Sequence, residues 1–227
     1  MSAIIMEKIS KIYNSGKPNQ FAALTDISLE IPKGQATILA GPSGSGKTTM
    51  LSLMGLMSRP SCGRITVLGR EATLLSEDFR TQLRRKHVGF IFQHFQLIGD
   101  LAVKDNLDLA LYPDGMPFHL IKERRIALLE KFELLAKSSE KVSVLSGGEQ
   151  QRLAIARALM NDPEIVLVDE PTAHLDTVLS RTVIALFQNL RDEGKTLVIA
   201  SHDPLVLSGG IADRVIHVRD GRIIEEA

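Results

Sequence analysis

The chain has little of several residue types that particular functions need. Cys62 is its only cysteine, so no disulfide can form within the chain and a cysteine-based zinc site lacks ligands. Tryptophan is absent and the only tyrosines are Tyr13 and Tyr112, which argues against a groove that stacks single-stranded bases. Lys+Arg and Asp+Glu number 27 each, so the net charge is zero and no overall field favours nucleic acid. No apolar run approaches the roughly 18 residues of a membrane-spanning helix, and Glu7 and Lys8 interrupt the place of a signal peptide's apolar segment.

What the chain does contain is the pattern of an α/β protein. Its content of 44% hydrophobic and 24% charged residues is ordinary for a folded domain. Short apolar runs at residues 36–40, 165–168 and 196–200 alternate with longer helical patterns. Such runs are typical of a mostly parallel sheet with helices on both faces. Polar residues follow each run directly, at the strand ends where open α/β sheets bind ligands.

The two ends of the chain predict an antiparallel β part. Residues 4–12 and 23–31 alternate loosely between apolar and polar on either side of a loop. Residues 215–224 predict a hairpin that turns at an Asp-Gly pair.

The middle of the chain predicts a helical insertion, because the strand signal disappears between residues 94 and 157. Four apolar residues of this segment have the spacing of one helix face: Ile121, Leu128, Phe132 and Leu135. We therefore expect a single domain over residues 1–227, with an α/β core at 1–93 and 158–227 and a helical subdomain at 94–157.

Residues 41–48 (Gly-Pro-Ser-Gly-Ser-Gly-Lys-Thr) fit the phosphate-loop pattern between a predicted strand and an apolar helix at 47–57. Glycines let successive backbone N–H groups turn toward phosphate oxygens, and the helix N-terminus adds a favourable dipole. We expect Lys47 to reach the β- and γ-phosphates and Thr48 to hold Mg²⁺. The candidate nucleotide-binding residues here are Gly41, Pro42, Ser43, Gly44, Ser45, Gly46, Lys47, Thr48 and Thr49.

A phosphate loop alone is compatible with kinases, GTPases and motors. Two carboxylates at the end of the apolar run 165–168 help to decide between these classes. Asp169 is placed to hold Mg²⁺ through water, and Glu170 to polarise an attacking water as general base. The plain alternative is a pair of solvated acids at a strand end. With a phosphate loop in the same chain, the pair favours hydrolysis.

Residues 145–150 (Leu-Ser-Gly-Gly-Glu-Gln) predict a second helix start suited to an anion. Ser146 is a good N-cap, and Gly147 and Gly148 leave the N–H groups of the first turn unobstructed. By these residues alone, a capped helix with a flexible start is an equally good interpretation.

Residues 145–150 resemble the signature motif of ABC-type ATPases, and further motifs follow that family's order. The phosphate loop resembles its Walker A motif, and residues 165–169 with Glu170 resemble Walker B and the catalytic glutamate. Residues 173–176 resemble the D-loop. Three single residues correspond to the adenine-stacking aromatic, the Q-loop glutamine and the switch histidine: Tyr13, Gln93 and His202.

The resemblance implies a P-loop NTPase (RecA-like) fold and Mg²⁺-dependent ATP hydrolysis. Two subunits would sandwich two ATP molecules, each between the Walker A loop of one subunit and the signature of the other. Catalysis would then fall to Glu170, His202 and Gln93, and metal binding to Thr48, Gln93 and Asp169. The remaining nucleotide contacts implied are Tyr13, Ser146, Gly147, Gly148, Glu149 and Asp176.

Residues 97–107 resemble the stretch after the Q-loop in ATPase subunits that serve lipoprotein-release, macrolide-export and cell-division membrane proteins. This likeness implies a peripheral subunit at the cytoplasmic face of the membrane. Its partners would be a second copy or a related ATPase subunit and a separate integral membrane subunit, with no nucleic acid. We expect no attached membrane domain, because the chain ends shortly after the predicted hairpin.

Two other functions remain to be compared with this one. A soluble ABC ATPase of DNA repair or translation usually carries a coiled-coil insertion or two cassettes, and neither is evident here. A small-molecule kinase would share the phosphate loop but would leave residues 145–150 and His202 unexplained.

Overall fold

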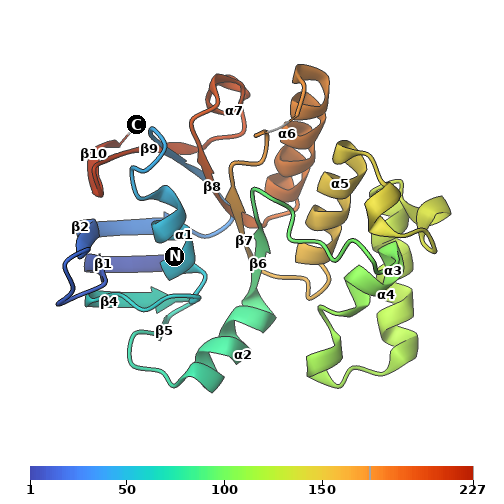
Figure 1. The fold of residues 1–227 in the computed structure, drawn as a ribbon, viewed down its shortest axis with the longest axis horizontal. Coiled ribbons are helices and arrows are strands. Elements are labelled where there is room, and N and C mark those ends of the chain that lie inside the picture. The colour runs from blue at the N-terminus through green and yellow to red at the C-terminus, as the bar shows by residue number, and fades with distance from the viewer. Residues whose placement is uncertain (174, 227) are drawn as a thin grey trace.

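The computed structural model describes residues 1–173 and 175–226, which form two β-sheets with helices between and around them (Figure 1). The strands of the larger sheet are β3 (Ala36–Ala40), β6 (Val88–Ile91), β7 (Ile165–Asp169), β8 (Thr196–Ser201), β9 (Arg214–Arg219) and β10 (Arg222–Glu226). Their order is β10-β9-β3-β8-β7-β6, and all pairings are parallel except that of β9 with β10. The expected mostly parallel α/β sheet and its terminal hairpin are confirmed.

The smaller sheet is antiparallel and has the order β2-β1-β4-β5. Its strands are β1 (Ser2–Tyr13), β2 (Phe21–Pro32), β4 (Cys62–Val67) and β5 (Arg70–Glu71). The pairing of β1 with β2 confirms the predicted antiparallel strands at the N-terminus. The sequence pattern did not predict strands β4, β5 and β6, which the structure contains.

Seven α-helices and three 3₁₀ turns lie within the described residues. The helices are α1 (Lys47–Met54), α2 (Glu77–His87), α3 (Val103–Asp108), α4 (Phe118–Lys131), α5 (Gly147–Ala158), α6 (Thr177–Asp192) and α7 (Pro204–Ser208). The 3₁₀ turns are η1 (Tyr112–Asp114), η2 (Leu135–Lys137) and η3 (Val142–Val144). The predicted helix at 47–57 ends early, because Gly55 caps α1.

Alternate residues of the central strands face two different cores, as the two-residue period of a strand requires. Ile38 of β3 packs in a core with Leu153 of α5 and Phe187 of α6. Leu39, the next residue, packs in the other core with Leu51 of α1 and Ile4 of the antiparallel sheet. Helix α1 therefore lies between the two sheets, and the start of α1 is fixed against the ends of the central strands (Figure 1).

The segment at 94–157 is helical, and its sole β feature among described residues is a single bridge between Ala102 and Lys141. Ile121, Leu128 and Phe132 are buried along one side of α4, as predicted. Leu135 is 41% exposed, so its expected place on this buried face is wrong. Helix α4 ends at Lys131, and Glu133 then adopts a left-handed φ of 57° that redirects the chain into η2.

A buried ion pair joins the two helices that follow the Q-loop segment. Asp108 at the end of α3 accepts a short hydrogen bond from Arg125 of α4, and both side chains are almost fully buried. Burial raises the pKa of Asp108, while the neighbouring Arg125 opposes that rise. The pair locks α3 to α4, because losing either partner would leave a buried charge uncompensated.

No helix in the described part of the chain combines the length and the apolar composition needed to cross a membrane.

The two phenylalanines of the α4 region provide a test of this packing. Phe132→Ala should lower the free energy of unfolding by about 3–5 kcal/mol, because Phe132 is 1% exposed and its removal leaves a cavity. Phe118→Ala is the matched control and should change the unfolding free energy by less than about 0.5 kcal/mol, because Phe118 is 63% exposed. Urea unfolding followed by circular dichroism measures both, and equal losses would contradict the inward face assigned to α4.

Candidate functional site

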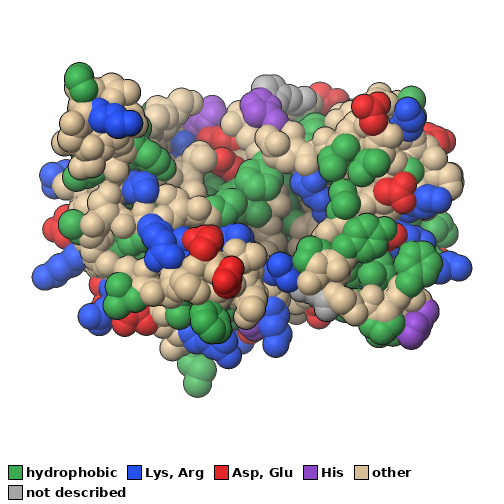
Figure 2. All heavy atoms as spheres, turned by 60° about the horizontal axis from the view of Figure 1, so that its bottom comes forward, with side chains coloured by type: hydrophobic (Ala, Val, Ile, Leu, Met, Phe, Trp, Pro, Cys, Tyr) green, Lys and Arg blue, Asp and Glu red, His purple; other side chains and the backbone are tan. Residues whose placement is uncertain are grey.

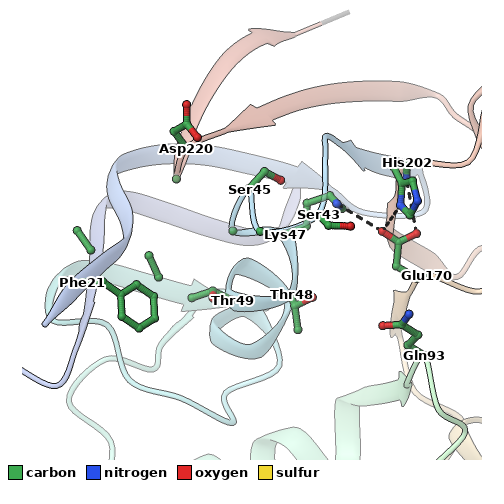
Figure 3. Close-up of a pocket in the computed structure, with 15 residues that line it drawn as sticks. Phe21, Ser43, Ser45, Lys47, Thr48, Thr49, Gln93, Glu170, His202 and Asp220 are labelled. Carbon is green, nitrogen blue, oxygen red and sulfur yellow. Dashed lines mark hydrogen bonds and ion pairs between the residues drawn. The ribbon is translucent and has the colours of Figure 1, made fainter. Parts of the chain in front are cut away.

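A cavity of about 590 Å³ lies where α1 begins beside the carboxyl ends of the central strands (Figure 3). Residues 43–49 of the phosphate loop form one wall, and residues 21–23 at the start of β2 form another. The remaining lining residues come from four other places in the chain: Gln93, Glu170, His202 and the Asp220–Gly221 turn. The cavity thus brings together all three residues that the family resemblance marks as catalytic.

The phosphate loop is held in place by very close backbone contacts. A Cβ on Gly46 would lie 2.9 Å from the carbonyl oxygen of Ala23, and Gly46 has a left-handed φ of 107°. A Cβ on Gly41 would lie 2.1 Å from the carbonyl oxygen of Val218. Only glycine fits these two positions, so the loop is wedged between β2 and β9.

Lys47 is buried at the base of this loop, with 5% of its side chain exposed. Its Nζ donates hydrogen bonds to the carbonyl oxygens of Gly41 at 2.7 Å and Pro42 at 3.1 Å. Nζ also lies 3.4 Å from Oε1 of Glu170. A cation so placed is ready to contact an anion that enters the cavity.

Glu170 and His202 are brought together, as their expected shared role requires (Figure 3). Nδ1 of His202 lies 2.9 Å from Oε1 of Glu170, and the Glu170 carboxylate is 11% exposed. The Glu170 backbone takes a left-handed φ of 45°, and its N–H donates to the carbonyl of Ala200 at 2.9 Å. This geometry aims a carboxylate into the cavity, where it can accept a proton from a bound water.

Thr48 lines the cavity, and Asp169 lies directly behind it in contact with its hydroxyl. Thr48 Oγ1 donates to Oδ1 of Asp169 at 3.2 Å, and Asp169 is 6% exposed. Burial raises the pKa of Asp169, and the hydrogen bond from Thr48 works against that rise. Hydroxyl and carboxylate oxygens are the ligands that Mg²⁺ prefers, and Gln93 also lines the cavity. The residues present therefore fit Mg²⁺ bound beside a nucleotide phosphate.

The signature residues lie away from this cavity, at the start of α5 (Figure 1). Ser146 is the N-cap, and with Glu149 it forms a reciprocal capping box. The Glu149 carboxylate accepts from the Ser146 N–H at 2.8 Å and from Lys137 Nζ at 2.7 Å. These contacts, led by that of Lys137, lower the pKa of Glu149 to about 2. Gly147 is exposed, so the first turn of α5 is open to solvent on one side.

Asp176 is also outside the cavity lining of its own chain. Its Oδ1 accepts from the N–H groups of Val178 and Leu179, both at 2.9 Å, and it caps α6 while remaining exposed. His174, within the expected D-loop, lies outside the described residues.

Tyr13 stands at the edge of the site rather than in its wall. Its ring stacks on that of Phe21, with centroids 5.3 Å apart and an interplanar angle of 23°. Lys11 Nζ lies 4.9 Å from the centroid of the Tyr13 ring. Phe21 is the aromatic that lines the cavity, with 54% of its surface exposed. Sequence reasoning missed Phe21, although its place shortly before the predicted strand at 23–31 was visible.

Asp220 and Gly221 were predicted as a hairpin turn but not as part of the site. The Gly221 N–H donates to the carbonyl of Ser45 at 3.0 Å, and its own carbonyl accepts from Thr25 N–H at 2.9 Å. A Cβ on Gly221 would lie 2.6 Å from the Ala23 carbonyl oxygen. The turn therefore ties the phosphate loop to β2, a contact that sequence spacing cannot reveal.

Arg157 links the signature helix to the loop that follows Gln93. Its guanidinium donates to the carbonyl of Phe95 at 2.7 Å and to that of Gln96, and burial lowers its pKa. Phe95 and Gln96 both have left-handed φ values, of 54° and 51°. Arg157 thus stabilises a strained turn beside the cavity.

Comparison with known proteins identifies the family. A family profile described as ABC transporter matches residues 24–173. The macrolide export ATP-binding/permease protein MacB of Hahella chejuensis is 40% identical over 223 residues, which cover 98% of this chain and 34% of that protein. MacB of Vibrio parahaemolyticus is 37% identical over 228 residues, which cover 100% of this chain and 34% of that protein. This chain therefore spans about a third of the length of these curated relatives.

Solved structures give the same result over nearly whole chains. The ATP-binding cassette MJ0796, in a dimeric post-hydrolysis state bound to ADP and Pi, is 35% identical with a TM-score of 0.89. That match covers 99% of this chain and 97% of MJ0796. The cbiO1 protein of Clostridium perfringens, part of the transporter complex cbiONQ, is 27% identical with a TM-score of 0.87, covering 100% of this chain and 88% of that one. The chain belongs to the ABC transporter family and is one of its ATP-binding cassettes.

Proposed function

We propose that this cassette binds Mg²⁺-ATP in the cavity at the start of α1 and hydrolyses it as one half of a pair. The observation that carries the proposal is the convergence of Lys47 and His202 on the Glu170 carboxylate, with Lys47 Nζ 3.4 Å and His202 Nδ1 2.9 Å from its Oε1. Phosphoanhydride hydrolysis requires a base for the attacking water and positive charge near the phosphates, and this cluster contains a carboxylate, an ammonium group and an imidazole.

Each side chain has a distinct task in this proposal. Lys47 and the N–H groups of the phosphate loop bind the phosphates and offset their negative charge. Glu170 accepts the proton of the attacking water, and His202 holds the Glu170 carboxylate in place through Nδ1. Thr48, Asp169 and Gln93 hold Mg²⁺, which supplies Lewis-acid stabilisation of the phosphate charge.

A second subunit is proposed to complete the site. The cavity is lined by the chain's own phosphate loop, whereas Ser146, Gly147 and Gly148 lie at the start of α5. The signature of a second copy, or of a related ATPase subunit, would therefore face the γ-phosphate. The dimeric state of MJ0796 supports such a pair.

An integral membrane subunit is proposed as the other partner, with the cassette at the cytoplasmic face of the membrane. The relatives named MacB combine an ATP-binding part with a permease. Ile98 in the segment after Gln93 is 48% exposed. Figure 2 shows further apolar side chains gathered on the right, over the α3–α4 region, where Leu109, Tyr112 and Phe118 are exposed. Such a surface suits a protein partner.

Export is the proposed direction of transport, of a macrolide-like, lipid, lipoprotein or peptide cargo. The similarity to MacB supports this assignment. It also supports a transporter over the alternative of a soluble ATPase in DNA repair or translation. A zero net charge gives that alternative no electrostatic support, and we propose no nucleic-acid partner.

ATP-dependent pairing is the test of this function. Glu170→Gln should slow hydrolysis by roughly 10²–10⁴-fold, because the amide cannot accept the proton of the attacking water. Unhydrolysed ATP should then hold two chains together, so the variant should be a dimer with ATP and a monomer with ADP. Size-exclusion chromatography with light scattering measures the mass of each state.

The control places bulk at the start of α5. Ser146→Arg added to Glu170→Gln should abolish the dimer while leaving ATP bound to the monomer, because Ser146 lies outside the cavity of its own chain. A Glu170→Gln protein that stays monomeric with ATP, even with a membrane partner supplied, would contradict the composite site.

The stacked pair of aromatics is proposed to bind the adenine. Phe21→Ala and Tyr13→Ala should each weaken ATP binding by about 1–3 kcal/mol, because base stacking on an aromatic is lost. The two losses should not add, since the rings form one stacked unit. Tyr13→Phe and the distant Tyr112→Ala should both change ATP affinity by less than about 0.5 kcal/mol. Calorimetric titration measures these values, and fully additive losses would argue against a shared base site.

Charge reversal tests the proposed docking segment. Lys104→Glu in α3 should impair transport-coupled activity of the full complex, because it reverses a charge within the segment proposed to dock, and should leave ATP affinity of the isolated chain unchanged. Lys8→Glu, on the antiparallel sheet, is the matched control and should leave coupled activity intact. Crosslinks from the membrane subunit to the antiparallel sheet instead would show that the docking surface is assigned to the wrong face.

A further inference from the structure

The signature segment carries a negative charge close to the point where a phosphate is expected. Oε2 of Glu149 lies 2.8 Å from the Ser146 nitrogen and 2.9 Å from Ser146 Oγ. The Ser146 hydroxyl donates to this carboxylate and also accepts from the Glu149 N–H at 3.4 Å. An anion that approaches Ser146 therefore meets Glu149 as well.

Protonation cannot remove this charge under ordinary conditions. Lys137 and the Ser146 backbone lower the pKa of Glu149 to about 2, so its carboxylate is ionised at any physiological pH. A like charge within a few ångströms disfavours phosphate binding, in a region where solvent screens it only in part.

Lys137 supplies the opposite charge. It belongs to the η2 turn after α4, and its Nζ lies 2.7 Å from Oε1 of Glu149, the oxygen that Ser146 does not use. The two carboxylate oxygens thus have separate partners, Lys137 on one side and the cap of α5 on the other. Contact with Glu149 in turn raises the pKa of Lys137, so the amine stays charged.

We propose that Lys137 is a positioning residue of the composite ATP site, which neutralises Glu149 and so lets the start of α5 accept the γ-phosphate of ATP bound to the other subunit. With Lys137 in place, the Ser146 hydroxyl can turn from the carboxylate to the phosphate while Glu149 keeps Lys137 and the Ser146 N–H as partners. This inference rests on the proposed pairing of two cassettes.

Dimer affinity in the Glu170→Gln background tests the role of Lys137. Lys137→Met should weaken the ATP-dependent dimer about 10-fold, because Glu149 is left without a counter-charge beside the phosphate. Lys137→Arg should retain dimer affinity within about 2-fold, since the guanidinium also pairs with a carboxylate. Analytical ultracentrifugation at a series of concentrations gives the dissociation constants.

A second substitution separates charge from structure. Glu149→Gln removes the negative charge, so adding it to Lys137→Met should recover most of the lost affinity. Raising the salt concentration should likewise reduce the difference in dimer affinity between Lys137→Met and its parent, because salt screens the partly exposed carboxylate of Glu149. A purely structural role of Lys137 would produce neither effect.

The matched control is Lys131→Met in the same background. Lys131 Nζ forms an ion pair with Glu193 at 2.6 Å, and neither residue takes part in the cap of α5. It should leave dimer affinity unchanged, and ATP affinity of the monomer should be unaffected in Lys137→Met.

The outcomes distinguish this inference from the function on which it depends. If Glu170→Gln itself does not pair with ATP, both are overturned. If Glu170→Gln pairs and Lys137→Met pairs equally well, or if Glu149→Gln brings no recovery, the role of Lys137 alone is overturned.

Discussion

In-register pairing of three buried parallel strands is the constraint on which the site depends. Ala40 at the end of β3 pairs with Ser201 at the end of β8, and Asp169 at the end of β7 pairs with Ala200. The loops that leave these strands must therefore start side by side. A slip of one residue would turn each strand's apolar side chains toward the wrong core and would separate Lys47, Glu170 and His202.

The sequence predicted best those elements whose local residue pattern agrees with their environment in the folded structure. β3, β7 and β8 are continuous apolar runs because both faces are covered, and the phosphate loop follows one of them directly. The capping box of α5 was partly visible for the same reason, since Ser146 and its glycines precede a helical pattern.

The sequence pattern did not predict elements that depend on contacts with residues distant in the chain. Strand β6 contains Gly89, which a strand pattern disfavours, but a Cβ there would lie 2.5 Å from the Ala158 carbonyl oxygen of α5. Helix α2 lacks an apolar stripe, and its buried Arg80 instead donates to the carbonyls of Leu56 and Ser58. Leu135 matched the spacing of α4, but the chain leaves the helix four residues earlier. In each case tertiary contact overrides the local signal.

The hydrogen bonds of Lys47 have a consequence for how tightly a nucleotide can bind. The amine is already engaged by the carbonyls of Gly41 and Pro42 and lies close to the Glu170 carboxylate. An incoming phosphate must exchange with partners that the protein itself provides, so the gain is the difference between two sets of bonds. The carbonyl oxygens of Gly41 and Pro42 and the Glu170 carboxylate therefore compete with a bound phosphate for the Lys47 amine, which limits the affinity that this contact can add.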